Sequence, residues 1–311
     1  MTQPVPPNGP LANPDLLRAL LGHDAVLPLT GQAADKLAYF AQALGTTPDA
    51  AEADADLPRL AVLIHAAREV AGYYGRLSAG AVAGKMPMIL ARAASKATAA
   101  ESPAPATIRS ATSADRVDVV SREASHEGHF LTQTFELRHP GFRGGMSDIL
   151  RREVFVATDA AIVLPYDPLR DRVLLVEQFR MGPFGRGDPY PWVLEPVAGR
   201  VDAGETPDAC ARRECVEEAH LTLHGIEHVS SHYCTPGCST EMFHCYVGLC
   251  DLPELARGLG GLETENEDIR THVLSFEAGM DLVRTGEANI GPMILLFLWL
   301  ERERARLRGA A

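Results

Sequence analysis

Residues Gly199–Leu221, GRVDAGETPDACARRECVEEAHL, decide the fold of this chain. Thr206 is a favoured helix N-cap and Pro207 suits the first helical position, so the stretch predicts a helix that begins there. Three glutamates on this helix follow at spacings of three and four: Glu214, Glu217 and Glu218. Their carboxylates share one helix face and repel each other unless a cation or a proton compensates. Such oxygen ligands favour Mg²⁺ or Mn²⁺ over zinc.

The spacing of these residues resembles the signature of the Nudix hydrolase family. That signature runs Gly, five residues, Glu, seven residues, Arg-Glu, an aliphatic residue, any residue, Glu-Glu, any residue, Gly and an aliphatic residue. The matching positions are Gly199, Glu205, Arg213, Glu214, Glu217, Glu218 and Leu221. Cys215 replaces the first aliphatic residue, and as a small apolar thiol it suits a core face. The alternative is a solvated acidic helix whose arginine pairs with its neighbours.

His220 stands where the family signature has its second glycine. Glycine there would allow the helix to end in the left-handed conformation. Histidine tolerates this conformation better than most residues, so a slightly strained helix end is expected.

The resemblance extends from about Arg116 to the C-terminus and points to the ADP-ribose pyrophosphatase branch. Pro236 lies fifteen residues after Leu221, where that branch carries a proline. The phrases YDPLRDRVLLVEQFR, PWVLEPVAGR, TPGCSTE and ENEDIR also look like this branch, and like bacterial members linked with tellurite resistance. The resemblance implies an α/β fold, namely the Nudix α/β/α sandwich with a mixed sheet. It also implies Mg²⁺- or Mn²⁺-dependent hydrolysis of ADP-ribose to AMP and ribose 5-phosphate.

The same resemblance implies roles for individual residues. The metal-binding candidates are the carbonyl of Ala198 and the carboxylates of Glu214, Glu217 and Glu218. Arg213 would orient a glutamate through its planar fork. The catalytic base would come from the acidic loop GGLETENEDIR, where Glu265 matches the family position and Glu267 is the second choice. The substrate-binding candidates are Arg152, Arg180, Pro236 and Glu241.

Two of these assignments have strong structural alternatives. A surface salt bridge is an equally good explanation of Arg152. The acidic loop, considered without its neighbouring motif, is typical of a solvated turn. Phe130 could stack on adenine, although an aromatic residue in a strand more often belongs to the core.

Composition limits the class of protein. The chain has 311 residues, of which 46% are hydrophobic and 23% charged, as in an ordinary globular protein. Its net charge of −12 argues against a nucleic-acid partner. The N-terminus lacks the features of a signal peptide, and the apolar run Pro292–Leu300 is too short to cross a bilayer. A cytoplasmic location without a membrane partner is therefore expected.

Cysteines and histidines cluster late in the chain. All six cysteines fall between Cys210 and Cys250. A zinc site could be imagined from His232, Cys234, Cys238 and His244, but these residues lack the tight pair spacing of zinc fingers. Reduced thiols packed in a core are the preferred interpretation.

The chain divides by composition into three parts. Residues 1–100 are alanine-rich and predict helices of unknown role, including one around Leu60–Tyr74 and one over Pro87–Lys96. Residues 8–22 faintly resemble the start of γ-glutamylcyclotransferase-like domains, which suggests a degenerate remnant. Residues 101–113 are rich in Pro, Ser, Thr and Ala and predict a linker.

Residues 114–311 would form the Nudix domain. Its first strands, Arg116–Arg122 and His129–His139, would build a sheet that contributes to substrate binding and to a homodimer, as the family resemblance implies. The apolar run Asp171–Arg180 predicts a buried central strand. Helices are expected over Phe276–Thr285 and Pro292–Arg308.

Two other functions stay open at this stage. One is a pyrophosphatase for a different nucleotide sugar or for a dinucleotide, with the same metal chemistry and a different pocket. The other is a non-enzymatic sensor that binds ADP-ribose and signals through the N-terminal helices.

Overall fold

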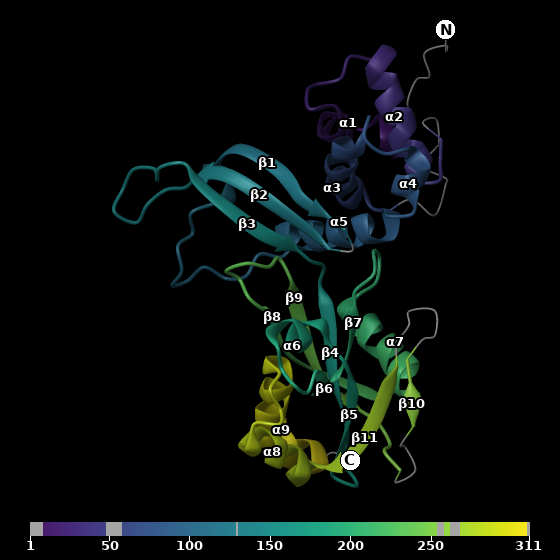
Figure 1. The fold of residues 1–311 in the computed structure, drawn as a ribbon, viewed down its shortest axis with the longest axis vertical. Coiled ribbons are helices and arrows are strands. Elements are labelled where there is room, and N and C mark those ends of the chain that lie inside the picture. The colour runs from purple at the N-terminus through teal and green to yellow at the C-terminus, as the bar shows by residue number, and fades with distance from the viewer. Residues whose placement is uncertain (1–8, 48–57, 129, 254–257, 262–267, 310–311) are drawn as a thin grey trace. The chain divides into compact units, whose positions relative to one another are not determined.

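A computed structural model describes residues 9–47, 58–128, 130–253, 258–261 and 268–309 (Figure 1). Its contacts divide the chain into two compact units. The first comprises Met1–Thr158 with Asp202–Gly204, and the second comprises Asp159–Val201 with Glu205–Ala311. Within the described residues, no helix is both long enough and apolar enough to span a membrane.

The first unit begins with short helices around a core of leucine, alanine and aromatic side chains. Their bounds are η1 Gly9–Ala12, α1 Pro14–Leu21, α2 Gly31–Ala43, α3 Leu60–Val70, η2 Ala71–Tyr73, α4 Ala79–Ala83 and α5 Met86–Glu101. Leu16, Phe40, Leu63 and Ile89 are fully buried among them. The described residues before Ser102 form helices and no strand, as the sequence pattern predicts. The final helix runs longer than Pro87–Lys96 because its alanine-rich end continues the helix.

A three-stranded antiparallel sheet completes the first unit. After η3 (Ala114–Arg116), its strands are β1 (Asp118–Glu127), β2 (Leu131–Arg138) and β3 (Leu150–Val156), in the order β1-β2-β3. The predicted hairpin is therefore present. Nearly every residue of β1 is exposed, which is consistent with its position at the edge of this sheet.

The second unit is built on a mixed sheet. Among the described residues the strand order is β10-β11-β5-β4-β9-β8, with β6 paired to β5 and β7 paired to β4. The β4–β9 pair is parallel, and the other pairs are antiparallel. The bounds are β4 Ala160–Asp167, β5 Arg172–Phe179, β6 Trp192–Glu195, β7 Val197–Arg200, β8 Gly225–Tyr233, β9 Met242–Leu249, β10 Leu259–Gly260 and β11 Ile269–Ser275.

Helices cover both faces of this sheet, as Figure 1 shows. The helix α7 (Pro207–Ala219) packs on one face, and α8 (Phe276–Thr285) with α9 (Gly291–Gly309) packs on the other. A short helix, α6 (Met181–Arg186), follows β5. The expected α/β/α sandwich with a mixed sheet is confirmed.

Successive side chains of the central strand β5 point alternately to the α7 side and to the α8 and α9 side of the sheet. Leu174 and Val176 belong to the same buried cluster as Cys210 and Cys215 of α7. Val173 and Leu175 belong to the cluster that contains the buried aromatic residues of α8 and α9. Even-numbered side chains of β5 therefore face α7, and odd-numbered ones face α8 and α9.

The ends of α7 agree with the sequence signals. At its start, the hydroxyl of Thr206 accepts a hydrogen bond from the N–H of Ala209 at 3.2 Å. At its end, His220 takes the left-handed conformation, with φ 53° and ψ 35°. The N–H of Leu221 then donates to the carbonyl of Cys215 at 2.9 Å, which closes the helix.

Because His220 occupies a conformation that favours glycine, His220→Gly is expected to stabilise the protein. The expected gain in the free energy of unfolding is about 0.5–1 kcal/mol, measured by urea denaturation. His220→Ala serves as the control, since alanine keeps the Cβ that makes this conformation costly. An equal gain from both variants would contradict strain at this position.

Candidate active site

Arg213, in the middle of α7, gathers the carboxylates of three glutamates. Its Nε and Nη2 each donate to Glu205 at 2.9 Å. Its Nη1 donates to Glu214 at 2.6 Å and to Glu217 at 2.9 Å. The pKa of Arg213 is raised above its ordinary value despite partial burial. The hydrogen bonds to Glu205 contribute most to this increase, and the negative charge of Glu214 adds to it. The guanidinium is therefore a permanent positive centre for this cluster.

Glu218 occupies a different position from the other three glutamates. Its side chain is buried, and its Oε2 accepts a hydrogen bond from the N–H of Ala198 at 3.2 Å. Ala198 lies on β7, which is paired with β4. The hydrogen bond between α7 and β7 thus brings together two of the predicted metal-binding residues, Glu218 and Ala198.

Gly199 has a steric reason to be glycine. A Cβ at this position would lie 1.8 Å from Oε1 and 1.9 Å from Cδ of Glu214. No L-residue with a side chain could therefore occupy this place without displacing the carboxylate. The glycine of the motif lets Glu214 lie directly against β7.

The chemistry of this cluster fits a divalent cation. Three carboxylates, those of Glu205, Glu214 and Glu217, share the guanidinium of Arg213, and a fourth, that of Glu218, comes from the same helix as Arg213. This excess of hard oxygen donors favours Mg²⁺ or Mn²⁺. In the described ranges, however, no group of three or more His, Cys, Asp or Glu side chains is arranged to hold a metal ion. The carboxylate oxygens point instead to Arg213 and to the N–H of Ala198.

Arg180 is paired with a glutamate that the sequence reasoning missed. It follows β5, and its Nε donates to Oε2 of Glu195, on β6, at 2.8 Å. The Glu195 side chain is 14% exposed, whereas that of Arg180 is 43% exposed. Burial raises the pKa of the Glu195 carboxyl, and the charge of Arg180 opposes this increase. A charged residue inside the apolar run PWVLEP is the signal that could have found it.

The raised pKa of Glu195 leads to a prediction about stability and pH. A carboxyl with a raised folded-state pKa stabilises the fold below its unfolded value, near 4.5, and this contribution is lost as pH rises through the folded-state pKa. Glu195→Gln removes this titration. The stability of wild type minus that of the variant should therefore decrease as pH rises above 4.5, measured by urea denaturation at several pH values. A difference that increases with pH would contradict the raised pKa.

The other predicted substrate residues lie on two different segments. Glu241 accepts a hydrogen bond from the thiol of Cys234 at 3.1 Å, and Pro236 lies in the exposed turn between them. Arg152 lies on β3 in the first unit, where its Nη1 donates to the carbonyl of Arg151 at 2.9 Å. The described residues offer it no acidic partner, so the salt-bridge alternative has no support among them. Glu265 and Glu267 lie outside the described residues.

The cysteines behave as thiols. All six are free, and four are buried: Cys210, Cys215, Cys245 and Cys250. Of the four residues of the imagined zinc site, His244 instead contacts Asp159 at 3.2 Å, and Cys238 is exposed. The preferred interpretation of core thiols thus holds for most of them.

Comparison with known proteins agrees with this geometry. The model of the NUDIX domain matches residues 157–293. The chain is 38% identical over 192 residues to the ADP-ribose pyrophosphatase of Escherichia coli (strain K12), covering 62% of this chain and 91% of that relative. It is 34% identical over 194 residues to the ADP-ribose pyrophosphatase of Haemophilus influenzae, covering 62% and 89%. The chain belongs to the Nudix family.

The branch expected from the sequence motifs is also confirmed by these relatives. A more distant likeness is to the GDP-mannose pyrophosphatase of Salmonella paratyphi B, 32% identical over 151 residues, covering 49% of this chain and 78% of that relative. The stretch Gly199–Leu221 is therefore the Nudix box, and α7 is its helix.

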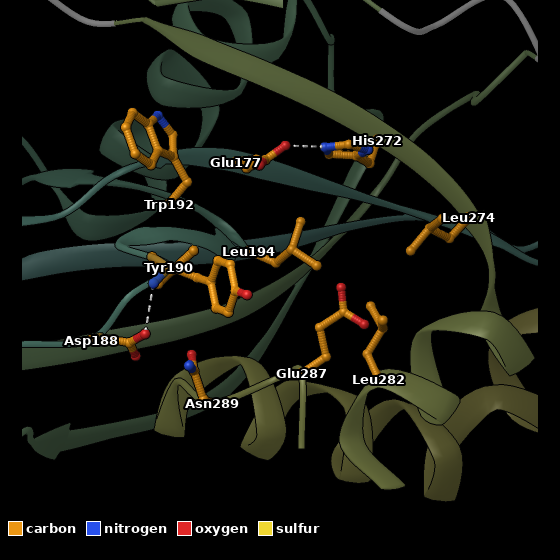
Figure 2. Close-up of a pocket in the computed structure, with 11 residues that line it drawn as sticks. Glu177, Asp188, Tyr190, Trp192, Leu194, His272, Leu274, Leu282, Glu287 and Asn289 are labelled. Atoms are coloured by element: carbon orange, nitrogen blue, oxygen red, sulfur yellow. Dashed lines mark hydrogen bonds and ion pairs between the residues drawn. The ribbon is translucent and has the colours of Figure 1, made fainter. Parts of the chain in front are cut away.

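A pocket of about 630 Å³ lies on the other side of the Nudix sheet (Figure 2). Its walls include Tyr190 and Trp192, and at one side His272 contacts Glu177 at 2.8 Å. Glu177 is an odd-numbered residue of β5, so its side chain points to the layer of α8 and α9. The pocket is thus separate from the carboxylates of the Nudix box.

Proposed function

We propose that this protein hydrolyses the diphosphate bond of ADP-ribose to give AMP and ribose 5-phosphate, using Mg²⁺ or Mn²⁺. The observation that carries the proposal is the intact box: Arg213 holds three glutamates, and Glu218 lies against β7. The names of the relatives from Escherichia coli and Haemophilus influenzae support ADP-ribose as the substrate.

In this proposal the box residues form the ion site. Glu214, Glu217 and Glu218, with the carbonyl of Ala198, would hold the divalent ion. Glu214 and Glu217 accept hydrogen bonds from Arg213, so they would exchange part of that contact for the cation. When bound, the ion neutralises charge on the diphosphate and makes water a better nucleophile. Arg213 would keep the carboxylates aligned through its hydrogen bonds to them.

The remaining residues position the substrate and move the proton. Arg180, half-exposed and already bound to Glu195, would turn its free guanidinium nitrogens to the diphosphate. Water adds to one phosphorus, the bridging oxygen leaves with the other phosphate, and Glu265 accepts the proton of the water, with Glu267 as the second choice. Arg152, Pro236 and Glu241 would contact the ribose and adenine portions.

Assembly and location belong to the same proposal. We propose a homodimer in the cytoplasm, in which the sheet β1–β3 contributes to the interface. The free thiols support a reducing compartment. Light scattering of the purified protein tests the dimer, and a monomer at micromolar concentration would contradict it.

A panel of substrates tests the reaction itself. The panel contains ADP-ribose, GDP-mannose, NADH and a diadenosine polyphosphate, with Mg²⁺, with Mn²⁺ and with EDTA. The proposal expects AMP release, fastest from ADP-ribose and abolished by EDTA. Faster hydrolysis of GDP-mannose would favour the second candidate, which the Salmonella relative supports. Binding of ADP-ribose with Mg²⁺ but without product would indicate a sensor.

A further inference from the structure

A second pocket lies within the first unit, among residues to which no role has been given. Its volume is about 560 Å³, within the range of small-molecule sites. Helices α3 and α5 form one side, and strands β1 and β2 form the other. The lining residues are His65, Arg68, Glu69, Gly72, Tyr73, Arg76, Lys96, Arg122, Glu123, Ala124, Glu127, Leu131 and Gln133.

Most of the acidic side chains in this wall are already neutralised. Glu69 is held by Arg92 through two hydrogen bonds, one of them from Nε at 3.2 Å, and both side chains are nearly buried. Glu127 is held in the same way by Arg76. Each of these carboxylates is therefore already paired with an arginine.

The remaining charges leave the pocket positive. With Glu69 paired to Arg92, which lies outside the lining, and Glu127 paired to Arg76, the lining keeps Arg68, Lys96 and Arg122 against Glu123, a surplus of two positive charges. This is unusual in a chain with a net charge of −12. Among the described residues, Lys96 and Arg122 make no hydrogen bond or ion pair.

Lys96 is the most informative member of this group. Its side chain is only partly accessible, and an ammonium removed from water is costly without a counter-charge. Burial lowers the pKa of Lys96, and the charge of Glu69 only partly opposes this shift. Burial, together with the charges of Arg68 and Lys96, also lowers the pKa of His65. These directions are what a positive and partly dehydrated pocket produces. An anion in the pocket would remove the cost.

We propose that this pocket, lined by Arg68, Lys96 and Arg122, binds the phosphate group of a small phosphomonoester. A phosphomonoester carries close to two negative charges near neutral pH, which matches the surplus. Two guanidinium forks and one ammonium are suited to its three terminal oxygens. The apolar side chain of Leu131 and the ring of Tyr73 offer walls for the rest of the molecule. The N-terminal helices then serve as one half of a ligand site.

Calorimetric titration of the full chain in EDTA tests this proposal, since chelation separates it from catalysis at the Nudix box. The probes are inorganic phosphate, glucose 6-phosphate and malonate. Wild type is expected to bind glucose 6-phosphate more tightly than malonate. Arg122→Gln and Lys96→Met should each weaken this binding at least about tenfold. Arg138→Gln, an exposed arginine of β2 outside the pocket, should leave it unchanged.

Two results would overturn the proposal. One is a lack of heat from both phosphate probes at about 10 mM, a concentration that detects even weak sites. The other is equal binding by wild type, Arg122→Gln and Lys96→Met. A melting curve guards against misfolding: Lys96→Met should raise the melting temperature of the unliganded protein, by about 2 °C, because it removes a positive charge that burial disfavours. A lower melting temperature would mean that Lys96 stabilises the fold through contacts with the protein, and would also count against the site.

Discussion

Glu218→Gln is expected to lower the rate of AMP release from ADP-ribose by about 10²–10³-fold, the range for removal of one preorganised group that stabilises charge in the transition state. Glu218 is 2% exposed and accepts a hydrogen bond from the N–H of Ala198. Glutamine keeps an oxygen for that bond, so the contact between α7 and β7 should survive. The variant removes the negative charge that would bind the cation. Initial rates at several Mg²⁺ concentrations measure this effect.

Two controls give this result its meaning. Glu301→Gln, at an exposed position of α9, should hydrolyse ADP-ribose at the wild-type rate. Thermal melting of Glu218→Gln should match wild type, because the cluster loses repulsion as well as a charge. AMP release at the wild-type rate by the folded variant would refute the assignment of Glu218 to the ion site. If the variant melts early, Glu217→Gln, which is more exposed, decides the question instead.

Local signals in the sequence were sufficient to predict much of the Nudix unit. Thr206 and His220 mark the two ends of α7 because capping depends on a few adjacent residues. The central strand β5 follows from an apolar run that a sheet covered on both faces requires. The family signature then predicted which carboxylates lie together on the helix.

Contacts between distant segments could not be predicted in this way. Arg180 meets Glu195 because β5 and β6 pair with Phe179 opposite Trp192, and sequence alone does not fix that register. The positive pocket joins Arg68 on α3 to Arg122 on β1, which are more than fifty residues apart. Each of its charged residues looks like an ordinary surface residue in the sequence. Their common position depends on packing in the first unit.

Gly199→Ala is expected to reduce AMP release at least about 100-fold, since misplacing a reacting group by about 1 Å can cost this much. The added Cβ would lie 1.8 Å from Oε1 of Glu214, so the carboxylate must turn away from β7. The affinity for Mg²⁺, measured by calorimetry, should fall together with the rate. The melting temperature should change little, because the group displaced is the end of a flexible side chain.

Combining Gly199→Ala with Glu214→Ala distinguishes displacement of the Glu214 carboxylate from general damage to β7. If Gly199→Ala acts only by displacing the Glu214 carboxylate, it can do no further harm once that carboxylate has been removed. The double variant should then be no less active than Glu214→Ala alone. If the fold-losses of activity of the two single variants multiply in the double variant, the alanine at position 199 harms the site by another route. Gly291→Ala serves as the matched control, because a Cβ there meets nothing within 4 Å. Its activity should equal that of wild type, so that the loss at Gly199 reflects the close approach of strand and carboxylate.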